Sequence, residues 1–245
     1  MGLFTEIDAR KKLLDAKRPL PVHTVQSLQE HLLIEWTYHS NAIEGNTLTL
    51  AETQVVLEGI TVGGKTLREH LEVINHREAI LYIEEIVKKD ESLSEWQIKN
   101  IHHLIVSKID DENAGAYRRE NVRIAGAKYI PPPFYELPGE MERLIQWYEG
   151  DGRVLHPVER AAQLHIRFVG IHPFAGGNGR TSRLLLNLEL MKHGYPPVVI
   201  HRELRTEYYD SLDQAHTTGD CRDFIVLVEA ELKHELDTYL KLLDN

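Results

Sequence analysis

The segment PVERAAQLHIRFVGIHPFAGGNGRTSRLLLNLELMK, residues 157–192, contains two long stretches compatible with helices, separated by a glycine-rich loop. Proline is favoured in the first turn of a helix, so Pro157 marks the start of the first one. Gly194 and Pro196 follow the second stretch and are typical of a helix end. The sequence therefore predicts helices from Pro157 to about Ile171 and from about Arg180 to Lys192.

The rest of the chain continues the helical pattern, with one exception. Apolar residues recur at helical spacing, as at Ile98, Ile101 and Ile105. Residues 122–130 contain Gly126 and are followed by three prolines, which favours a short hairpin. We therefore predict an all-α helical bundle with one short β-hairpin, and a last helix over most of residues 224–243. Capping boxes predict further helix starts at Thr49 with Glu52, Thr66 with Glu69, and Ser94 with Gln97.

Charge, hydropathy and cysteine content exclude several classes of protein. The formal net charge of −10 disfavours binding to the phosphate backbone of nucleic acids. No apolar run approaches the roughly 20 residues of a membrane span, and the N-terminus holds no secretory signal, so we expect no membrane association. Cys221 is the only cysteine, which fits a reducing compartment. These features predict a cytoplasmic protein.

The loop between the two long helices brings together groups that suit phosphate chemistry. In HPFAGGNGR, residues 172–180, three glycines within four positions let backbone N–H groups converge without obstruction by Cβ atoms. The helix N-terminus that follows favours an anion. Arg180 and Arg183 are three residues apart and can project toward that anion, and His172 is a natural proton acceptor near neutral pH. This pattern predicts phosphoryl or nucleotidyl transfer; the alternative is a plain interhelical turn with a structural His172.

The segment resembles the signature of the Fic (filamentation induced by cAMP) domain family, His-x-Phe-x-(Asp/Glu)-Gly-Asn-Gly-Arg-x-x-Arg. Every specified position matches except Gly176, where the family has an acidic residue. The similarity extends over the Gly-Ala-Tyr-Arg run at residues 115–118 and most of residues 91–240. We therefore expect a Fic core over residues 91–245 and an N-terminal helical region over residues 1–90.

The resemblance implies a protein adenylyltransferase, which moves AMP from ATP to a protein hydroxyl. His172 would act as general base on a target Ser, Thr or Tyr, with Asn178 and Arg180 as further catalytic residues. Tyr209 and Leu212 match positions that line the adenine pocket, although packing in a helix core explains them equally well, and His216 stands where some relatives have Asn. The implied nucleotide-binding residues are Gly177, Asn178, Gly179, Arg180, Arg183, Tyr209 and Leu212.

The resemblance also implies the partner. The predicted hairpin matches the family flap, which pairs by its backbone with a segment of the target protein. The expected partner is thus a protein with an exposed hydroxyl side chain, and a homodimer is a candidate state because related members often form dimers. The flap residues are Val122, Arg123, Ile124, Ala125, Gly126, Ala127 and Lys128.

A second motif, SNAIEG at residues 40–45, resembles the family's inhibitory motif Ser/Thr-x-x-x-Glu-Gly/Asn, which begins here at Ser40. Its position before the core matches the subclass with an N-terminal inhibitory helix, here about residues 36–45. Gly45 is typical of a helix C-cap and leaves Glu44 at the helix end. A carboxylate pairs strongly with a guanidinium, so Glu44 on Arg183 would occupy the place of the γ-phosphate.

Two alternatives remain open. Gly176 offers no ligand where the family's acidic residue holds Mg²⁺, so we expect Mg²⁺ to arrive bound to ATP. The chain is then either an active transferase or a nucleotide-binding regulatory module with weak or no activity. The second alternative is a P-loop NTPase, because residues 59–66 satisfy the Walker A pattern. No spacing of the fourteen histidines predicts a protein-bound metal.

Overall fold

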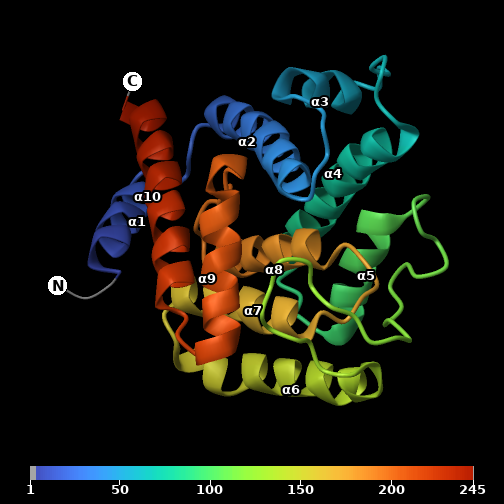
Figure 1. The fold of residues 1–245 in the computed structure, drawn as a ribbon. Helices are drawn as coiled ribbons and strands as arrows, with labels where there is room; N and C mark the ends of the chain where they lie inside the picture. The colour runs from blue at the N-terminus through green and yellow to red at the C-terminus, as the bar shows by residue number, and fades with distance from the viewer. Residues whose placement is uncertain (1–3, 245) are drawn as a thin grey trace.

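The computed structural model describes residues 4–244 as a bundle of helices (Figure 1). Over that range it contains no β-strand, and none of its helices is both long and apolar enough to cross a membrane. The elements are α1 (Thr5–Ala16), α2 (Val22–Ile43), α3 (Leu50–Leu57), α4 (Leu67–Lys88), α5 (Glu95–Val106), η1 (Phe134–Glu136), α6 (Leu137–Glu149), η2 (Asp151–Val154), α7 (Pro157–Ile171), α8 (Asn178–Lys192), η3 (Arg202–Leu204), α9 (Arg205–Thr218) and α10 (Arg222–Asp244).

Helices α7 and α8 pack against each other in the middle of the bundle (Figure 1). Almost every residue of α8 is buried, including the run Leu184–Leu186. A helix that is buried around most of its circumference is surrounded by other elements, and here the buried residues include polar ones such as Arg183 and Glu189. The predicted helix over 157–171 is confirmed, and the second one begins slightly earlier than expected, at Asn178.

Two hydrophobic clusters pack against this central pair. One joins α4, α5 and α6 to α7 and α8, and the other joins α1, α9 and α10 to them. Each fully buried large apolar side chain contributes roughly 1.5–3 kcal/mol. Because both clusters include side chains of α7 and α8, the loop between these helices is fixed by both of them. Representative members are Ile83, Ile101, Phe168 and Leu185 in the first cluster and Ile7, Ile166, Leu186 and Phe224 in the second.

The predicted helix starts are largely confirmed. Thr49 and Thr66 each form a complete capping box with the glutamate three residues later. Ser94 is the N-cap of α5, but its hydroxyl contacts the Gln97 side chain and makes no bond to the backbone. The start of α5 is therefore as expected and its capping box is not.

The predicted β-hairpin at residues 122–130 is wrong. The segment makes a turn, in which the Ala127 N–H donates to the Ile124 carbonyl at 3.2 Å, but no strand pairing follows. The Lys128 and Tyr129 amides instead donate to the Asp213 carboxylate on α9, at 2.8 and 3.0 Å. A strand needs a neighbouring strand to satisfy its backbone, and here a helix side chain replaces it. We keep the name flap for residues 122–130.

The P-loop alternative is also wrong. Residues 59–66 follow a helix, α3, whereas a P-loop follows a strand of a parallel sheet. The Lys65 ammonium donates to the Thr47 carbonyl at 2.5 Å and lies 3.4 Å from Glu52, so it stabilises the connection between α2 and α4.

Candidate active site

The loop between α7 and α8 begins and ends with residues in the left-handed conformation. His172 has φ 50° and ψ 56°, and Gly177 has φ 74°. For a residue other than glycine this conformation costs about 1–2 kcal/mol and is often found at functional sites. The first amides of α8 have no acceptor within the helix, and the helix dipole makes this end positive. The loop thus presents an N-terminus suited to a phosphate.

Asn178 closes the loop on itself. Its side-chain oxygen accepts from the Phe174 N–H at 3.0 Å, and its side-chain nitrogen donates to the Phe174 carbonyl at 2.8 Å. The side chain is almost fully buried. In this structure it therefore shapes the loop, and its catalytic and nucleotide-binding roles stay predictions.

His102 and Arg118, which were not predicted as site residues, hold the loop from outside. His102 accepts from the Gly115 N–H at Nδ1, 3.0 Å away, so its Nε2 carries the proton donated to the Gly176 carbonyl at 2.9 Å. Its ring stacks on Phe174 with centroids 3.7 Å apart. Arg118 donates from Nε to the His172 carbonyl at 2.9 Å. Their partners in the loop lie more than fifty positions away in the sequence. Arg118 falls in the Gly-Ala-Tyr-Arg run at residues 115–118, which was a signal for it, whereas His102 stands in no motif.

His172 is in the correct protonation state for a base. Burial lowers the pKa of its imidazole to about 4, and the Arg118 guanidinium acts in the same direction. The ring is therefore neutral near pH 7 and can accept a proton. It lines a cavity of about 500 Å³.

Glu44 and Arg183 are in direct contact, as the resemblance implies. Glu44 Oε1 accepts from Arg183 Nη2 at 2.8 Å. The same guanidinium donates from Nη2 to the Ser40 carbonyl at 2.8 Å, from Nε to the Ser40 hydroxyl at 3.0 Å, and from Nη1 to the Tyr208 hydroxyl at 3.1 Å. Burial alone would raise the pKa of Glu44, but Arg183 and Arg180 hold it below its usual value. The pair is therefore ionised at neutral pH.

The end of α2 delivers Glu44 to this position. Glu44 is the C-cap, and Gly45 follows with φ 97°, a left-handed conformation suited to glycine. Arg205 Nε donates to the Ile43 carbonyl at 2.8 Å and links the helix end to α9. On the other side, a Cβ atom at Gly179 would collide with the Glu44 carboxylate. Gly179 therefore makes room for Glu44 at the start of α8.

The cavity beside this pair has the volume of a typical small-ligand site. Tyr209 and Leu212, the predicted adenine-pocket residues, both line it, as does His216, whose Nε2 is 2.8 Å from the Ile166 carbonyl. Flap residues 123–127 line it as well. The structure thus brings the loop, the flap and the end of α2 to one cavity.

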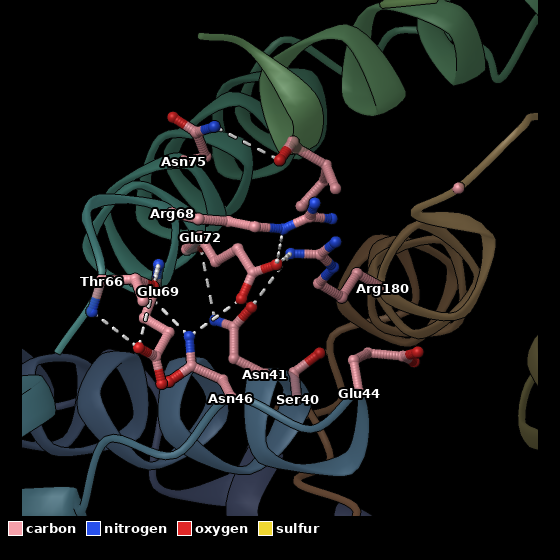
Figure 2. A network of polar contacts seen from close by, with 12 residues as sticks. Ser40, Asn41, Glu44, Asn46, Thr66, Arg68, Glu69, Glu72, Asn75 and Arg180 are labelled. Carbon is pink, nitrogen blue, oxygen red and sulfur yellow. Dashed lines mark hydrogen bonds and ion pairs between the residues drawn. The ribbon is translucent and has the colours of Figure 1, made fainter. Parts of the chain in front are cut away.

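Arg180 takes a different direction from Arg183. Its Nη1 donates to the Asn41 side-chain oxygen at 3.3 Å and lies 3.6 Å from Glu72 Oε1 (Figure 2). The guanidinium is buried against α2 and α4, and Arg180 does not line the cavity. The two arginines therefore reach different carboxylates, Arg183 that of Glu44 and Arg180 that of Glu72, and their contact with phosphate stays a prediction.

Comparison with known proteins agrees with this geometry. The model of the Fic/DOC family matches residues 92–190. Fic-1 (residues 134–508) from C. elegans superimposes with a TM-score of 0.88 at 32% identity, covering 98% of this chain and 72% of that one. This chain belongs to the Fic/DOC family. A Fic domain containing signaling protein from Bacteroides thetaiotaomicron gives a TM-score of 0.90 at 30% identity, over 98% of this chain and 97% of that chain.

A curated Fic protein is also similar to this chain in sequence. The protein adenylyltransferase Fic of Nematostella vectensis is 41% identical over 206 residues, which cover 83% of this chain and 48% of that protein. The chain spans about half the length of the curated relatives that it matches. The family match lies inside the predicted core of residues 91–245, and the division at residue 90 stays a prediction.

The described side chains around the loop offer no set of ligands for a protein-bound metal. Gly176 stands at the acidic position of the signature, exposed and without a side chain. Within residues 4–244, no group of three or more histidine, cysteine, aspartate or glutamate side chains could hold a metal ion. No step of the reaction is therefore assigned to a metal held by this chain.

Proposed function

We propose that this Fic protein transfers AMP from ATP to a hydroxyl group of a target protein, and that Glu44 inhibits the transfer. The single observation that carries the proposal is the partly buried Glu44–Arg183 contact at 2.8 Å, next to a loop that begins with a neutral His172 and ends at a helix N-terminus. The Nematostella relative, named as a protein adenylyltransferase, supports the reaction.

The proposed reaction uses groups that border one cavity, with the rest of the loop beside it. His172 removes the proton of a target Ser, Thr or Tyr, and the hydroxyl oxygen forms a bond to the α-phosphorus. The bond from that phosphorus to the bridging oxygen breaks, and pyrophosphate leaves with the electron pair. The amides of Gly177–Gly179 stabilise the growing charge on the α-phosphate. The Asn178 side chain supports this loop, and Tyr209 and Leu212 line the space for adenine.

Inhibition follows from competition for one guanidinium. Arg183 would bind the γ-phosphate with the donor that now contacts Glu44. Two anions cannot share that position, because like charges in a partly buried site repel strongly. In the wild-type chain Arg183 is therefore withheld from ATP, and the other signature arginine, Arg180, is also engaged elsewhere.

Incorporation of label from α-labelled ATP tests the proposal. Glu44→Gly should raise self-modification and the affinity for ATP, with the wild type nearly silent. His172→Ala in the Glu44→Gly background is the blank, because it removes the base and leaves the cavity. If Glu44→Gly binds ATP no better than the wild type, the inhibitory role of Glu44 is wrong.

A regulatory nucleotide-binding module is the second candidate, and Gly176 favours it. Without a carboxylate at this position, Mg²⁺ would have to arrive bound to ATP, and its place in the site would be less defined. This candidate predicts that the Glu44→Gly protein binds ATP tightly but incorporates no label. The target protein, a homodimeric state and a cytoplasmic location stay predictions.

A further inference from the structure

Glu72 is the centre of a polar network beneath the end of α2 (Figure 2). Its carboxylate accepts from Asn46 Nδ2 at 3.0 Å and from Arg68 Nε at 3.3 Å, and it lies 3.6 Å from Arg180 Nη1. The Glu72 side chain is only 12% exposed and that of Arg180 only 7%. One carboxylate on α4 therefore neutralises a buried arginine on α8 and contacts the segment that follows α2.

The partners of Glu72 lie on both sides of Glu44 in the sequence. Before it, Asn41 donates to the Thr37 carbonyl at 2.9 Å and to the Glu72 carbonyl at 3.4 Å, and accepts from Arg180 at 3.3 Å. After it, Asn46 donates to the Glu72 carboxylate and also to the Glu69 carbonyl, at 3.1 Å.

The turn between these two asparagines carries Glu44. The amides of Glu44 and Asn46 both donate to the Asn41 carbonyl, at 3.0 and 3.1 Å. The direction of the Glu44 side chain thus depends on where Asn41 and Asn46 are held. Figure 2 shows the Glu44 side chain pointing away from the network. Glu72 does not contact Glu44 itself.

We propose that Glu72 is a positioning residue for inhibition: through Asn46, and through Arg180 and Asn41, it holds the turn that presents Glu44 to Arg183. The proposal rests on the proposed inhibitory role of Glu44. Removing the Glu72 charge leaves the Arg180 guanidinium buried without a counter-ion, which is unfavourable. The turn then loses the charged part of its attachment, while the bonds from Asn46 to the Glu69 carbonyl and from Asn41 to the Glu72 carbonyl remain. A more loosely held Glu44 competes less effectively with an incoming phosphate.

The test compares Glu72→Gln with Arg68→Gln, in the wild type and in Glu44→Gly. Arg68 contacts the same carboxylate but is 69% exposed and has no contact with the turn. Glu72→Gln should raise the affinity for ATP roughly five- to tenfold, as expected when one buried charge-assisted contact is lost. Arg68→Gln should stay within about twofold of the wild type, as for an exposed pair. In the Glu44→Gly background, Glu72→Gln should add no further gain.

A gain in affinity separates positioning from general damage, because a loosened fold does not bind ATP more tightly. If Glu72→Gln binds ATP with the affinity of the wild type, the proposal is wrong. It is also wrong if Glu72→Gln raises the affinity for ATP equally in the Glu44→Gly background, because Glu72 would then act independently of Glu44. If Glu72→Gln does not fold, Asn46→Ala removes the same bond from the other side and decides by the same criteria.

Hydrogen exchange gives a readout that does not require ATP. Glu72→Gln should speed exchange of the Glu44 and Asn46 amides while leaving the amides of α8 unchanged. If Glu44→Gly binds ATP no better than the wild type, the proposed inhibition by Glu44 is wrong. Hydrogen exchange would then still show whether Glu72 holds the turn, because this measurement does not depend on ATP binding. Unchanged exchange at both amides overturns the attachment.

Discussion

The loop between α7 and α8, residues 172–177 (the signature loop), and the flap border the same cavity but are held in different ways. In the loop, Asn178 makes two hydrogen bonds to Phe174, and His102 makes a third to Gly176. In the flap, one turn bond and two bonds to Asp213 are the main attachments of the backbone. A cradle for a transition-state charge works best when it is preorganised. A backbone edge that pairs with a target segment must be left unpaired until the target arrives.

The largest expected effect is a loss of AMP transfer on replacing His172, at the start of the loop between α7 and α8. In the Glu44→Gly background, His172→Ala should reduce AMP transfer by about 10²–10⁴, because a general base is lost. The affinity for ATP should change little, since the base acts on the target hydroxyl. Label from α-labelled ATP and equilibrium binding measure the two quantities. Transfer at the parental rate would show that His172 is not the base.

Asn178→Ala tests the rigidity of the loop. It leaves the buried Phe174 N–H and carbonyl without partners, which costs about 2–3 kcal/mol. For a chain of this size Tm should fall by roughly 5–10 °C, measured by thermal unfolding.

Asn187→Ala is a matched control for that variant. Asn187 makes the same pair of bonds, to the Val198 amide and carbonyl, in a part of α8 remote from the loop. Both variants should lose stability, but only Asn178→Ala should also lose affinity for ATP. An equal loss of ATP binding in the two variants would contradict a specific role for the loop.

The sequence predicted the parts of the site that depend on local pattern. Helices α7 and α8 were predicted from proline, glycine and apolar spacing, and the Glu44–Arg183 contact from two recognisable motifs. The flap was predicted as a hairpin because glycine and proline mark turns, but strand pairing depends on a partner that sequence spacing does not reveal. His102 and Glu72 were missed for the same reason. Each acts on residues that are distant in sequence, so only the packing of helices identifies them.

The direction of Arg180 shows the same limit. Residues three apart on a helix lie on adjacent parts of its surface. Arg183 nevertheless reaches Glu44, whereas Arg180 turns to Glu72. Long side chains follow the nearest counter-ion, and the positions of these two carboxylates depend on how α2 and α4 pack on α8.

Asp213→Ala tests the weaker attachment of the flap and should lower Tm less than Asn178→Ala does. It removes the acceptor for the Lys128 and Tyr129 amides, at a cost of about 1 kcal/mol because these groups can bond to water instead. Tm should fall by no more than about 4 °C, while exchange of these two amides accelerates. Asp210→Ala, which removes a carboxylate one turn earlier on α9, is the control. A fall in Tm as large as that of Asn178→Ala would show that the flap is as rigid as the loop.

The smallest expected effect concerns the one position where the signature loop departs from its family. Gly176 does not adopt a left-handed conformation, and a Cβ atom there would meet nothing within 4 Å. Gly176→Asp should therefore fold without strain, with Tm within about 2 °C of the parent. In the Glu44→Gly background the new carboxylate offers Mg²⁺ a ligand beside the phosphates. We expect a few-fold rise in label incorporation with Mg²⁺ present, above the level of Glu44→Gly alone.

Gly176→Asn is the matched control, because it has the same shape without the charge. A rise in both variants would mean that the side chain stiffens the loop rather than binding the metal. If neither variant exceeds Glu44→Gly, the site works with the Mg²⁺ that ATP carries, and Gly176 is not a defect. The loop would then act as a cradle for the phosphates alone, which is the role that Asn178, His102 and the N-terminus of α8 already support.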